Sequence, residues 1–373
     1  MKRIAFFLPG GVAYPSHDVH IPSLYELISR LSQDFEIVVY SLTAFRKGAM
    51  TSSCGNAIVK FVSAHNDDHW TKKILLLLRS FSRDHQTNRF HFVHGMLGVT
   101  TELAAVITSY YYHIPSTISL LGGETANIQE INYGTLRTRR LRTLMRFICH
   151  QADIVTIMTK FQLEEMKRLG MYRNDLHIIP FGVDLNAFQP FRKRIPKEPF
   201  RFLHVGSLTP VKGQELLLRT FYSIREKVNA QLRIIGADYM NGSLQALSEQ
   251  LGIANDTAFM GYLNHSDLPS HYDWADVLLH TSFHEAQGVV IAEAAATRTT
   301  IAGTPVGLIA DFGRDMAIIV HERNPELLAA SVLDMLQQPV QLAEMRERAL
   351  QWAQQYDINR TVASFRHLYL THG

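Results

Sequence analysis

Short apolar runs alternate along this chain with longer stretches in which apolar positions recur every three or four residues. The short runs read as buried strands and fall at residues 1–8, 35–40, 57–62, 90–94 and 116–120. Helical patterns lie between them, for example at Ser23–Leu31 and Thr101–Tyr110. This alternation predicts a parallel sheet with helices on both faces.

The alternation starts again after a polar, basic and proline-containing segment, Phe191–Phe200, which suits a linker. Arg201–Phe221 reads as a strand, a turn and a helix, and Leu232–Ala237 as a further strand. Helical patterns then fill residues 325–337, 341–356 and 358–371. The order of elements predicts two successive α/β domains, in agreement with a length of 373 residues.

The composition is that of a folded, soluble chain, with 46% hydrophobic and 19% charged residues. Met1–Pro9 is short and leads directly into a glycine turn, so it reads as a first strand rather than a secretory signal. The sequence holds no run of about 18 apolar residues of the kind that spans a bilayer. Cys54 and Cys149 have neither zinc-site nor disulfide spacing, so we expect a reducing, cytoplasmic setting.

Positive charge concentrates in the first half of the chain. Residues 1–190 carry 20 lysines and arginines against 15 acidic residues, whereas residues 191–373 carry 17 against 19. Two stretches, Thr71–Arg83 and Gly134–Phe147, combine basic residues with leucines. Such helices can lie on an anionic membrane surface or can face a core with a solvated basic back, and the sequence leaves both readings open. Nucleic acid is disfavoured, because aromatic residues do not alternate with the basic ones.

Two histidine groupings contain residue types that bind metals. They are His17–His20 and His65–His69, both in polar, loop-like sequence. Neighbouring side chains along one loop rarely converge on a single ion. We therefore expect no metal site.

The stretch Leu278–Gly307 carries the strongest candidate for a binding site. An apolar run breaks and then resumes as an alanine-rich helical pattern, Val289–Thr297. Gly288 stands just before that helix, where free N–H groups and the helix dipole favour an anion. With Glu285 in the break and Glu293 on the helix, the stretch could hold the phosphate and hydroxyls of a nucleotide sugar. Any strand and helix pair can carry two such glutamates, so the pattern alone leaves a structural role equally open.

Two glycine turns and one histidine are further candidates. Lys212 follows a strand and precedes a helix, so it is placed to neutralise phosphate or is an ordinary surface lysine. Gly10 and Gly11 end the first strand, either as a turn that a ligand approaches closely or as a tight turn without one. His94 stands at the predicted end of strand 90–94, where ligands gather in parallel sheets, although a lone histidine there is more often structural.

The sequence that begins at Ser282, S-F-H-E-A-Q-G-V-V-I-A-E, resembles the signature of the family 4 retaining glycosyltransferases, which spaces two glutamates as here. The resemblance implies that Glu285 faces the donor sugar and that Glu293 binds the ribose. The donor-binding residues that it implies in this part of the chain are Tyr262, Leu263, Glu285, Gln287, Gly288, Val289 and Glu293. Ala286 and Gln287 depart from the usual family residues, which leaves the shape of the sugar pocket open.

A second resemblance lies in V-G-S-L-T-P-V-K-G, which is similar to the family's V-G-R-L-x-x-x-K-G. It implies that Ser207 and Lys212 occupy the place of the clamp on the donor diphosphate. Ser207 stands where the family has arginine, so one positive charge is missing. The resemblance also implies that His94 lies near the reacting sugar and that Gly10 and Gly11 face the acceptor and the diphosphate.

The fold implied by the resemblance is GT-B, with two Rossmann-like α/β domains facing each other across a cleft. The expected parts are an acceptor-binding domain at 1–188, a linker at 189–200, a donor-binding domain at 201–356 and a C-terminal helix at 357–373 that packs back on the first domain. The resemblance covers nearly all of the second domain and is strong from Ala152 to Pro190.

The implied reaction moves a hexosyl group, with retention, from a nucleotide diphosphate sugar to a hydroxyl of a sugar or lipid-linked acceptor. The setting would be polysaccharide or glycolipid synthesis at the inner face of a membrane, with His94, Lys212 and Glu285 as catalytic groups. The sequence has no D-x-D motif, so neither a metal nor a cofactor besides the sugar nucleotide is required. Two other functions stay open: a non-catalytic sugar-nucleotide binder, suggested by Ser207, and a GT-B sugar-nucleotide epimerase.

Overall fold

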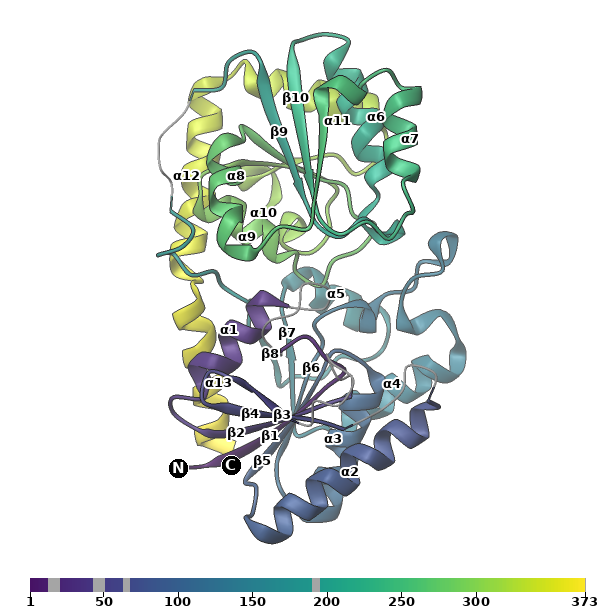
Figure 1. Ribbon diagram of the computed structural model, residues 1–373, viewed down its shortest axis with the longest axis vertical. Coiled ribbons are helices and arrows are strands. Elements are labelled where there is room, and N and C mark those ends of the chain that lie inside the picture. The colour runs from purple at the N-terminus through teal and green to yellow at the C-terminus, as the bar shows by residue number, and fades with distance from the viewer. Residues whose placement is uncertain (13–20, 43–50, 63–67, 190–194, 373) are drawn as a thin grey trace. The chain divides into compact units, whose positions relative to one another are not determined.

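The computed structural model of the protein describes residues 1–12, 21–42, 51–62, 68–189 and 195–372. It divides into two compact α/β units, shown in Figure 1: Met1–Phe181 with Asn359–Gly373, and Gly182–Ile358. Histidines 17, 20 and 65 of the two histidine groupings lie outside the described residues. The predicted linker at 189–200 is described only in part, and its bounds stay a prediction.

The first unit is built on an eight-stranded sheet with the order β3-β4-β2-β1-β5-β6-β7-β8. Its described strands run parallel except β3, which pairs antiparallel with β4 at the edge. The polar sequence of β3, Thr-Ser-Ser-Cys, gives no apolar run, and this strand was not predicted. The strands are β1 (Arg3–Leu8), β2 (Glu36–Ser41), β3 (Thr51–Cys54), β4 (Ala57–Phe61), β5 (Phe92–Met96), β6 (Ser116–Ser119), β7 (Ile154–Ile157) and β8 (Leu176–Ile178).

Five helices of this unit follow from ordinary start signals and apolar faces. Thr138 and Thr159 cap two of them by accepting from the N–H groups of Leu141 and Gln162. Three of the helices, α2, α3 and α4, bury their apolar residues in one core with the central strands. The helices are α1 (Pro22–Leu31), α2 (Trp70–Thr87), α3 (Val99–Tyr112), α4 (Arg139–Gln151) and α5 (Lys160–Arg168).

The second unit repeats the plan with a six-stranded parallel sheet of order β11-β10-β9-β12-β13-β14. One apolar cluster packs α6 and α11 on the sheet, and another packs α8, α9 and α10. The two clusters explain why its strands are apolar throughout. The elements are β9 (Phe200–Val205), α6 (Gln214–Arg225), β10 (Ala230–Ile235), α7 (Ser243–Gln250), β11 (Thr257–Gly261), α8 (Leu268–Trp274), β12 (Val277–His280), α9 (Val289–Ala296), β13 (Thr300–Gly303), α10 (Leu308–Met316), β14 (Ile318–Ile319), α11 (Pro325–Leu336) and α12 (Pro339–Gln355).

Each sheet reverses its strand order at one point, where ligands of open α/β sheets commonly bind. In the first unit the reversal lies between β1 and β5. In the second unit it lies between β9 and β12. The residues that follow β9 and β12 are Gly206–Gly213 and Thr281–Gly288, so both candidate motifs of the second unit lie at its reversal point.

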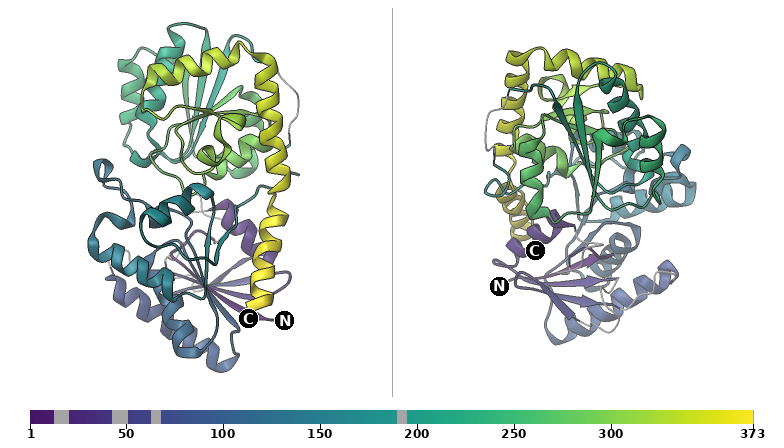
Figure 2. Two further views of the ribbon diagram at one scale, coloured as in Figure 1. Left: turned by 180° about the vertical axis from the view of Figure 1, so that it is seen from behind. Right: turned by 45° about the horizontal axis from the view of Figure 1, so that its top comes forward.

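The C-terminal helix α13 (Ile358–His372) belongs to the first unit, as expected from the sequence. Phe365 and Tyr369 are fully buried there, and the side chain of Lys2 donates to the carbonyls of Tyr369 and Leu370. The two ends of the chain consequently lie side by side (Figure 2). The helix thus completes the core of a unit whose other residues, Met1–Phe181, all come before the second unit in the chain.

The part of the chain that the structure describes contains neither a membrane-spanning helix nor a cluster of metal ligands. None of its helices is both long and apolar enough to cross a membrane. Nor does it bring together three His, Cys, Asp or Glu side chains that could hold a metal ion.

Candidate functional site

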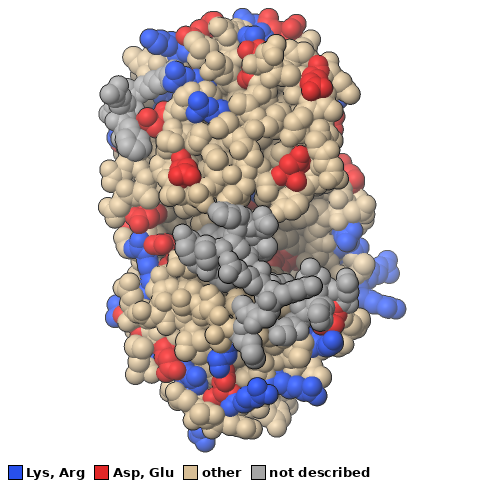
Figure 3. Space-filling view, in the orientation of Figure 1, with Lys and Arg blue, Asp and Glu red and all other residues tan. Residues whose placement is uncertain are grey.

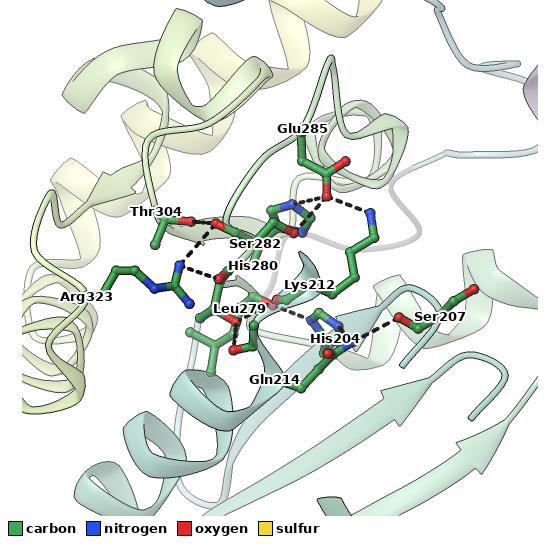
Figure 4. Close-up of polar contacts among 12 residues, drawn as sticks. His204, Ser207, Lys212, Gln214, Leu279, His280, Ser282, Glu285, Thr304 and Arg323 are labelled. Carbon is green, nitrogen blue, oxygen red and sulfur yellow. Dashed lines mark hydrogen bonds and ion pairs between the residues drawn. The ribbon is translucent and has the colours of Figure 1, made fainter. Parts of the chain in front are cut away.

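The carboxylate of Glu285 is the centre of a cluster at the reversal point of the second sheet. It lies in the loop between β12 and α9, and its side chain is 12% exposed. Its Oε1 atom lies 2.6 Å from Lys212 Nζ, 2.7 Å from Ser282 Oγ and 3.1 Å from His280 Nε2. Figure 4 shows these three groups converging on the carboxylate from different sides. One oxygen atom thus joins the loop after β9 to the loop after β12.

The environment keeps Glu285 ionised. Burial alone would raise the pKa of this carboxyl, but the charge of Lys212 and the contact with His280 lower it. The pKa of Glu285 therefore lies well below its ordinary value of 4.5. A carboxylate with a lowered pKa is a weak nucleophile, and the three contacts to its Oε1 atom include the ammonium group of Lys212, which it fixes in place.

The two loops that carry Lys212 and Glu285 are tied together through their backbones. The N–H of Phe283 donates to the carbonyl of Val211 at 2.7 Å, and the hydroxyl of Thr281 donates to the carbonyl of Gly213 at 3.0 Å. Arg323 donates to the carbonyls of Thr281 and Ser282, and its guanidinium lies 3.5 Å from the centre of the Phe283 ring. These contacts fix the site before any ligand arrives.

Three helices begin next to this ion pair. Gly213, Gly288 and Gly307 precede α6, α9 and α10, and each has a positive φ that glycine adopts without strain. A Cβ atom on Gly307 would lie 2.3 Å from the carbonyl oxygen of Gln287, so this close approach requires glycine. None of these three helix starts has a side-chain cap among the described residues. The first N–H of α10 is already taken, because Leu308 donates to the carbonyl of Gln287. The N–H groups that begin α6 and α9 are thus the ones suited to receive an anion.

Glu293 lies on α9, one turn beyond the helix start, and is 3% exposed. Its Oε1 atom is 2.9 Å from His265 Nε2, and its Oε2 atom accepts a hydrogen bond of 2.7 Å from the hydroxyl of Tyr272. Tyr272 belongs to α8, and His265 belongs to the short helix η6 (His265–Asp267). The two contacts hold the carboxylate in one orientation.

Ser207 and His204 lie on the β9 side of the cluster. Gln214 Nε2 donates to the carbonyl of Ser207 at 3.0 Å and lies 3.3 Å from His204 Nε2 (Figure 4). His204 is fully buried, and burial lowers its pKa to about 3. Neither residue brings a positive charge to the cluster, in agreement with the missing arginine at position 207.

The other predicted donor-binding residues lie in the same unit at different depths. Tyr262 and Leu263 follow β11 at its carboxyl end, and Tyr262 is 41% exposed. Gln287 is buried, and its carbonyl accepts from the N–H of Leu308. Val289 is the first residue of α9. The structure therefore brings Lys212, Glu285, Gly288 and Glu293 to one edge of the sheet, with Tyr262 and Leu263 at the end of its outermost strand.

The structure corrects the prediction for His94. Strand β5 continues to Met96, so His94 lies inside the strand and not at its end. Its side chain is fully buried, with Nδ1 2.6 Å from the hydroxyl of Tyr369 and Nε2 2.7 Å from that of Ser119. Burial lowers its pKa to about 3. The neutral ring with both nitrogens occupied thus packs as a core residue, and its role toward a sugar stays a prediction.

Gly10 and Gly11 follow β1 at the reversal point of the first sheet. Both are buried, Gly11 has a φ of 94°, and its carbonyl accepts from the N–H of Ile21. Their role toward a ligand stays a prediction.

The sequence analysis missed four side chains of the site: His265, Tyr272, His280 and Ser282. His280 ends the buried run Val277–His280, and a histidine at the end of such a run is a usable signal. Ser282 stands three residues before Glu285, a spacing that lets a hydroxyl reach a following carboxylate. No local pattern links His265 or Tyr272 to Glu293, because these contacts join separate elements.

Comparison with known proteins finds relatives of the second unit. The model of the family described as glycosyl transferases group 1 matches residues 186–353. The chain is 28% identical, over 58% of its length, to a D-inositol 3-phosphate glycosyltransferase of Catenulispora acidiphila, and the match spans 56% of that relative. The chain thus aligns with little more than half of this curated relative.

Two solved structures share the fold over the whole chain. Sucrose-phosphate synthase from Thermosynechococcus elongatus has a TM-score of 0.85 at 15% identity, covering 99% of this chain and 98% of that one. Anabaena HepE in complex with UDP-glucose has a TM-score of 0.74 at 15% identity, covering 98% of each chain. At such identities the likeness establishes the fold, which is the GT-B fold expected from the sequence.

Proposed function

The chain belongs to the glycosyl transferases group 1 family through its second unit, and we propose that it transfers a hexosyl group from a nucleotide diphosphate sugar to a hydroxyl. One observation carries the proposal. At the reversal point of the second sheet, the ammonium group of Lys212 is held beside the starts of α6 and α9, which lack side-chain caps among the described residues, with Glu293 one helical turn into α9. This arrangement offers positive charge and N–H donors to a diphosphate and a fixed carboxylate to a ribose.

In the proposed reaction, the bond between the anomeric carbon and the diphosphate oxygen breaks, and an acceptor hydroxyl oxygen forms the new bond. Lys212 and the N–H groups that begin α9 stabilise the charge that develops on the leaving diphosphate. The acceptor proton passes to a diphosphate oxygen as the hydroxyl attacks. Glu285 holds Lys212 through its Oε1 atom and faces the sugar hydroxyls in the proposed complex. It does not attack the sugar, because its Oε1 atom is already occupied.

Retention of configuration is part of the proposal. Double displacement would need a free carboxylate as nucleophile. Glu285 is bound by Lys212 and Ser282, and Glu293 by His265 and Tyr272. We therefore favour attack on the same face from which the diphosphate leaves.

The donor and acceptor classes rest on the relatives. Anabaena HepE has been crystallised with UDP-glucose, which makes UDP-glucose the first donor to test. The acceptor that we propose is a hydroxyl of a sugar or a lipid-linked sugar in polysaccharide or glycolipid synthesis. Gly10 and Gly11 remain the proposed turn of close approach in the first unit.

The test is a calorimetric screen of UDP-, GDP- and ADP-sugars, followed by product analysis with hydroxyl acceptors. We expect one nucleotide series to bind and its sugar to be transferred with the anomeric configuration retained. Failure of every nucleotide sugar to bind would contradict the proposal.

A non-catalytic sugar-nucleotide binder is the second candidate, because Ser207 leaves the diphosphate without the second cation of the family's clamp. Release of free sugar from the bound donor, in the absence of acceptor, separates the two. A catalytic protein hydrolyses its donor slowly, whereas a binder leaves it intact. An epimerase would instead change the sugar of the donor, which the same product analysis detects.

Association with an anionic membrane surface is a further part of the proposal. Arg139, Arg140 and Phe147 of α4 are exposed, as are Trp70 and Leu75 of α2. Basic side chains gather in Figure 3 on the side where Figure 1 shows these helices. Basic helices with exposed apolar residues bind to the interface of anionic bilayers.

Charge reversal tests the membrane surface. Each basic residue contributes about 1 kcal/mol near an anionic surface, so changing Arg139, Arg140 and Arg142 to Glu should weaken binding to anionic vesicles at least about tenfold. The matched control reverses Arg219 and Lys227, exposed residues of the second unit. Equal sedimentation of the wild-type protein, the α4 variant and the control with vesicles would mean that the basic face of α4 is simply solvated.

A further inference from the structure

His280 is a buried polar residue with an unused nitrogen beside the ion pair of the site. Its side chain is 1% exposed at the end of β12. Nε2 lies 3.1 Å from Glu285 Oε1, within ion-pair distance but not in hydrogen-bond geometry, and Nδ1 also has no hydrogen-bond partner among the described residues. A Cβ atom on Gly288 would lie 3.7 Å from Nε2, so the ring also borders the start of α9. Buried polar groups without a partner are rare and mark places where a ligand or a proton is expected.

We propose that His280 takes up a proton when the diphosphate of the donor binds, so that an imidazolium replaces Lys212 as the partner of Glu285. The inference rests on the proposed function, because it needs a diphosphate that competes for Lys212. In the free protein, Lys212 and Glu285 form a pair at 2.6 Å and neutralise each other. A diphosphate draws the ammonium group toward itself and leaves Glu285 short of positive charge.

The charges around His280 favour this exchange. Glu285 is its nearest charged neighbour, Lys212 approaches the same carboxylate oxygen, and Ser282 donates a neutral hydrogen bond to it. From β9, the ring of His204 lies 6.3 Å away, and its pKa of about 3 keeps it neutral. Once Lys212 turns to the diphosphate, the carboxylate therefore faces the imidazole of His280, the group of this set that can gain a positive charge by taking up a proton.

The proton balance is simple. One proton comes from solvent and binds the ring nitrogen that lacks a partner, so that both nitrogens of His280 carry hydrogen. The carboxylate of Glu285 stays ionised and is paired throughout. The bound state thus holds two cations, Lys212 and His280, around one carboxylate and the diphosphate. This second cation offsets the charge that Ser207 does not provide, and His280 acts as a positioning residue because it works through Glu285.

The test is calorimetric titration of UDP-glucose, repeated in buffers with different ionisation enthalpies. GDP-mannose replaces UDP-glucose if the screen shows a guanine preference. The diphosphate of a sugar nucleotide does not titrate near neutral pH, so a buffer-dependent heat reports protons taken up by the protein. We expect uptake of up to about one proton per donor, and an affinity that falls by up to about tenfold per pH unit as the pH rises through the histidine range.

His280→Gln is the deciding variant. Glutamine keeps an N–H donor for Glu285 but cannot gain a charge, so we expect the donor to bind without proton uptake and with a flat pH profile. His265→Gln is the matched control, because His265 also contacts a site carboxylate, Glu293. It should retain the uptake that His280 provides. A His280→Leu variant, which also loses the donor, should bind more weakly than His280→Gln.

The outcomes separate the two proposals. Binding of the donor without proton uptake in the wild-type protein, or uptake retained in His280→Gln, overturns the role of His280 and leaves the proposed function intact. If His265→Gln loses the proton uptake and His280→Gln keeps it, the proton binds at His265, beside Glu293. This outcome also overturns the role of His280. Failure of both sugar nucleotides to bind contradicts the proposed function and, with it, the inference.

Discussion

The two units each bury a glutamate close to the reversal point of the sheet, but its surroundings shift the carboxyl pKa in opposite directions. Glu102 of α3 is fully buried in the first unit, and the described residues place no cation against it. Burial and the nearby carboxylate of Glu124 raise its pKa well above 4.5, although an N–H of Gly98 lowers it. Glu285 of the second unit faces Lys212 and His280, and its pKa is lowered. The partners, rather than the depth, decide whether a buried carboxyl is charged.

The buried histidines differ in the same way. His94 in β5 has a hydroxyl on each ring nitrogen, so its capacity for hydrogen bonds is filled by the protein. His280 in β12 has one nitrogen at ion-pair distance from a carboxylate, and neither of its nitrogens makes a hydrogen bond within the described residues. Burial is nearly the same in both, at 0% and 1% exposed. Unfilled capacity therefore distinguishes a candidate site residue from a core residue in this chain.

Among the variants, Lys212→Met should have the largest effect, because it removes the cation that distinguishes the surroundings of Glu285 from those of Glu102. Without the ammonium group of Lys212, Glu285 loses the charge that lowers its pKa, and the leaving diphosphate loses the lysine of this cluster. Loss of one charged or N–H donor at a developing anion costs about 100- to 1,000-fold in rate. We expect a fall of this size in the turnover of the donor, measured by release of nucleotide diphosphate.

The control for Lys212 is Lys227→Met, which removes an exposed lysine of the same unit. It should turn over at the wild-type rate. Normal turnover by Lys212→Met with the donor that binds would show that the leaving group is stabilised elsewhere.

Glu293→Gln should have a smaller effect, confined to binding. Glutamine keeps the shape of the side chain and loses the charge that the ribose hydroxyls would meet. Hydrogen bonds to a charged group contribute about 1.5–3 kcal/mol, so nucleotide affinity should fall by about 10- to 100-fold. Calorimetry with the free nucleotide measures this directly, and an unchanged dissociation constant would remove Glu293 from the ribose site. Glu215→Gln, on the exposed side of α6, is the control.

Much of the fold could be predicted because it depends on local patterns. The apolar runs and helical repeats located the strands and helices of both sheets, and the final helix was expected to join the first unit. The polar edge strand β3 could not be found, since pairing with β4 rather than its own sequence makes it a strand. The end of β5 was placed two residues early, and this error made His94 look like a strand-end residue.

The site was predictable where its chemistry lies in one short stretch. Glu285, Gly288 and Glu293 come from one loop and helix, and Lys212 from the next motif. His265 and Tyr272 reach Glu293 from other elements, so only the fold reveals them. Only the fold also reveals the contact between His280 and Glu285, and it shows that the other nitrogen of His280 lacks a partner among the described residues. Sequence patterns located the charged groups, whereas the structure shows which of them are already satisfied.

The smallest expected effect concerns the pH dependence of the free energy of unfolding, to which Glu102 and Glu285 should contribute in opposite directions. The pKa of Glu102 is raised in the fold, so its contribution to stability is complete below about 4.5 and is lost as the pH rises toward its folded value. The pKa of Glu285 is lowered, so its contribution is complete above about 4.5 and is lost as the pH falls. The two slopes have opposite signs.

Replacing each glutamate by glutamine should remove its slope, about 1.4 kcal/mol per pH unit within its own window. We expect Glu102→Gln to gain stability relative to the wild-type protein as the pH rises above 5, and Glu285→Gln to gain stability relative to the wild-type protein as the pH falls below 5. Urea unfolding on both sides of this pH measures both, and Glu130→Gln, at an exposed site, is the control. Parallel pH curves for Glu102→Gln and the wild-type protein would mean that Glu102 is charged in the fold, and the contrast between the two units would then disappear.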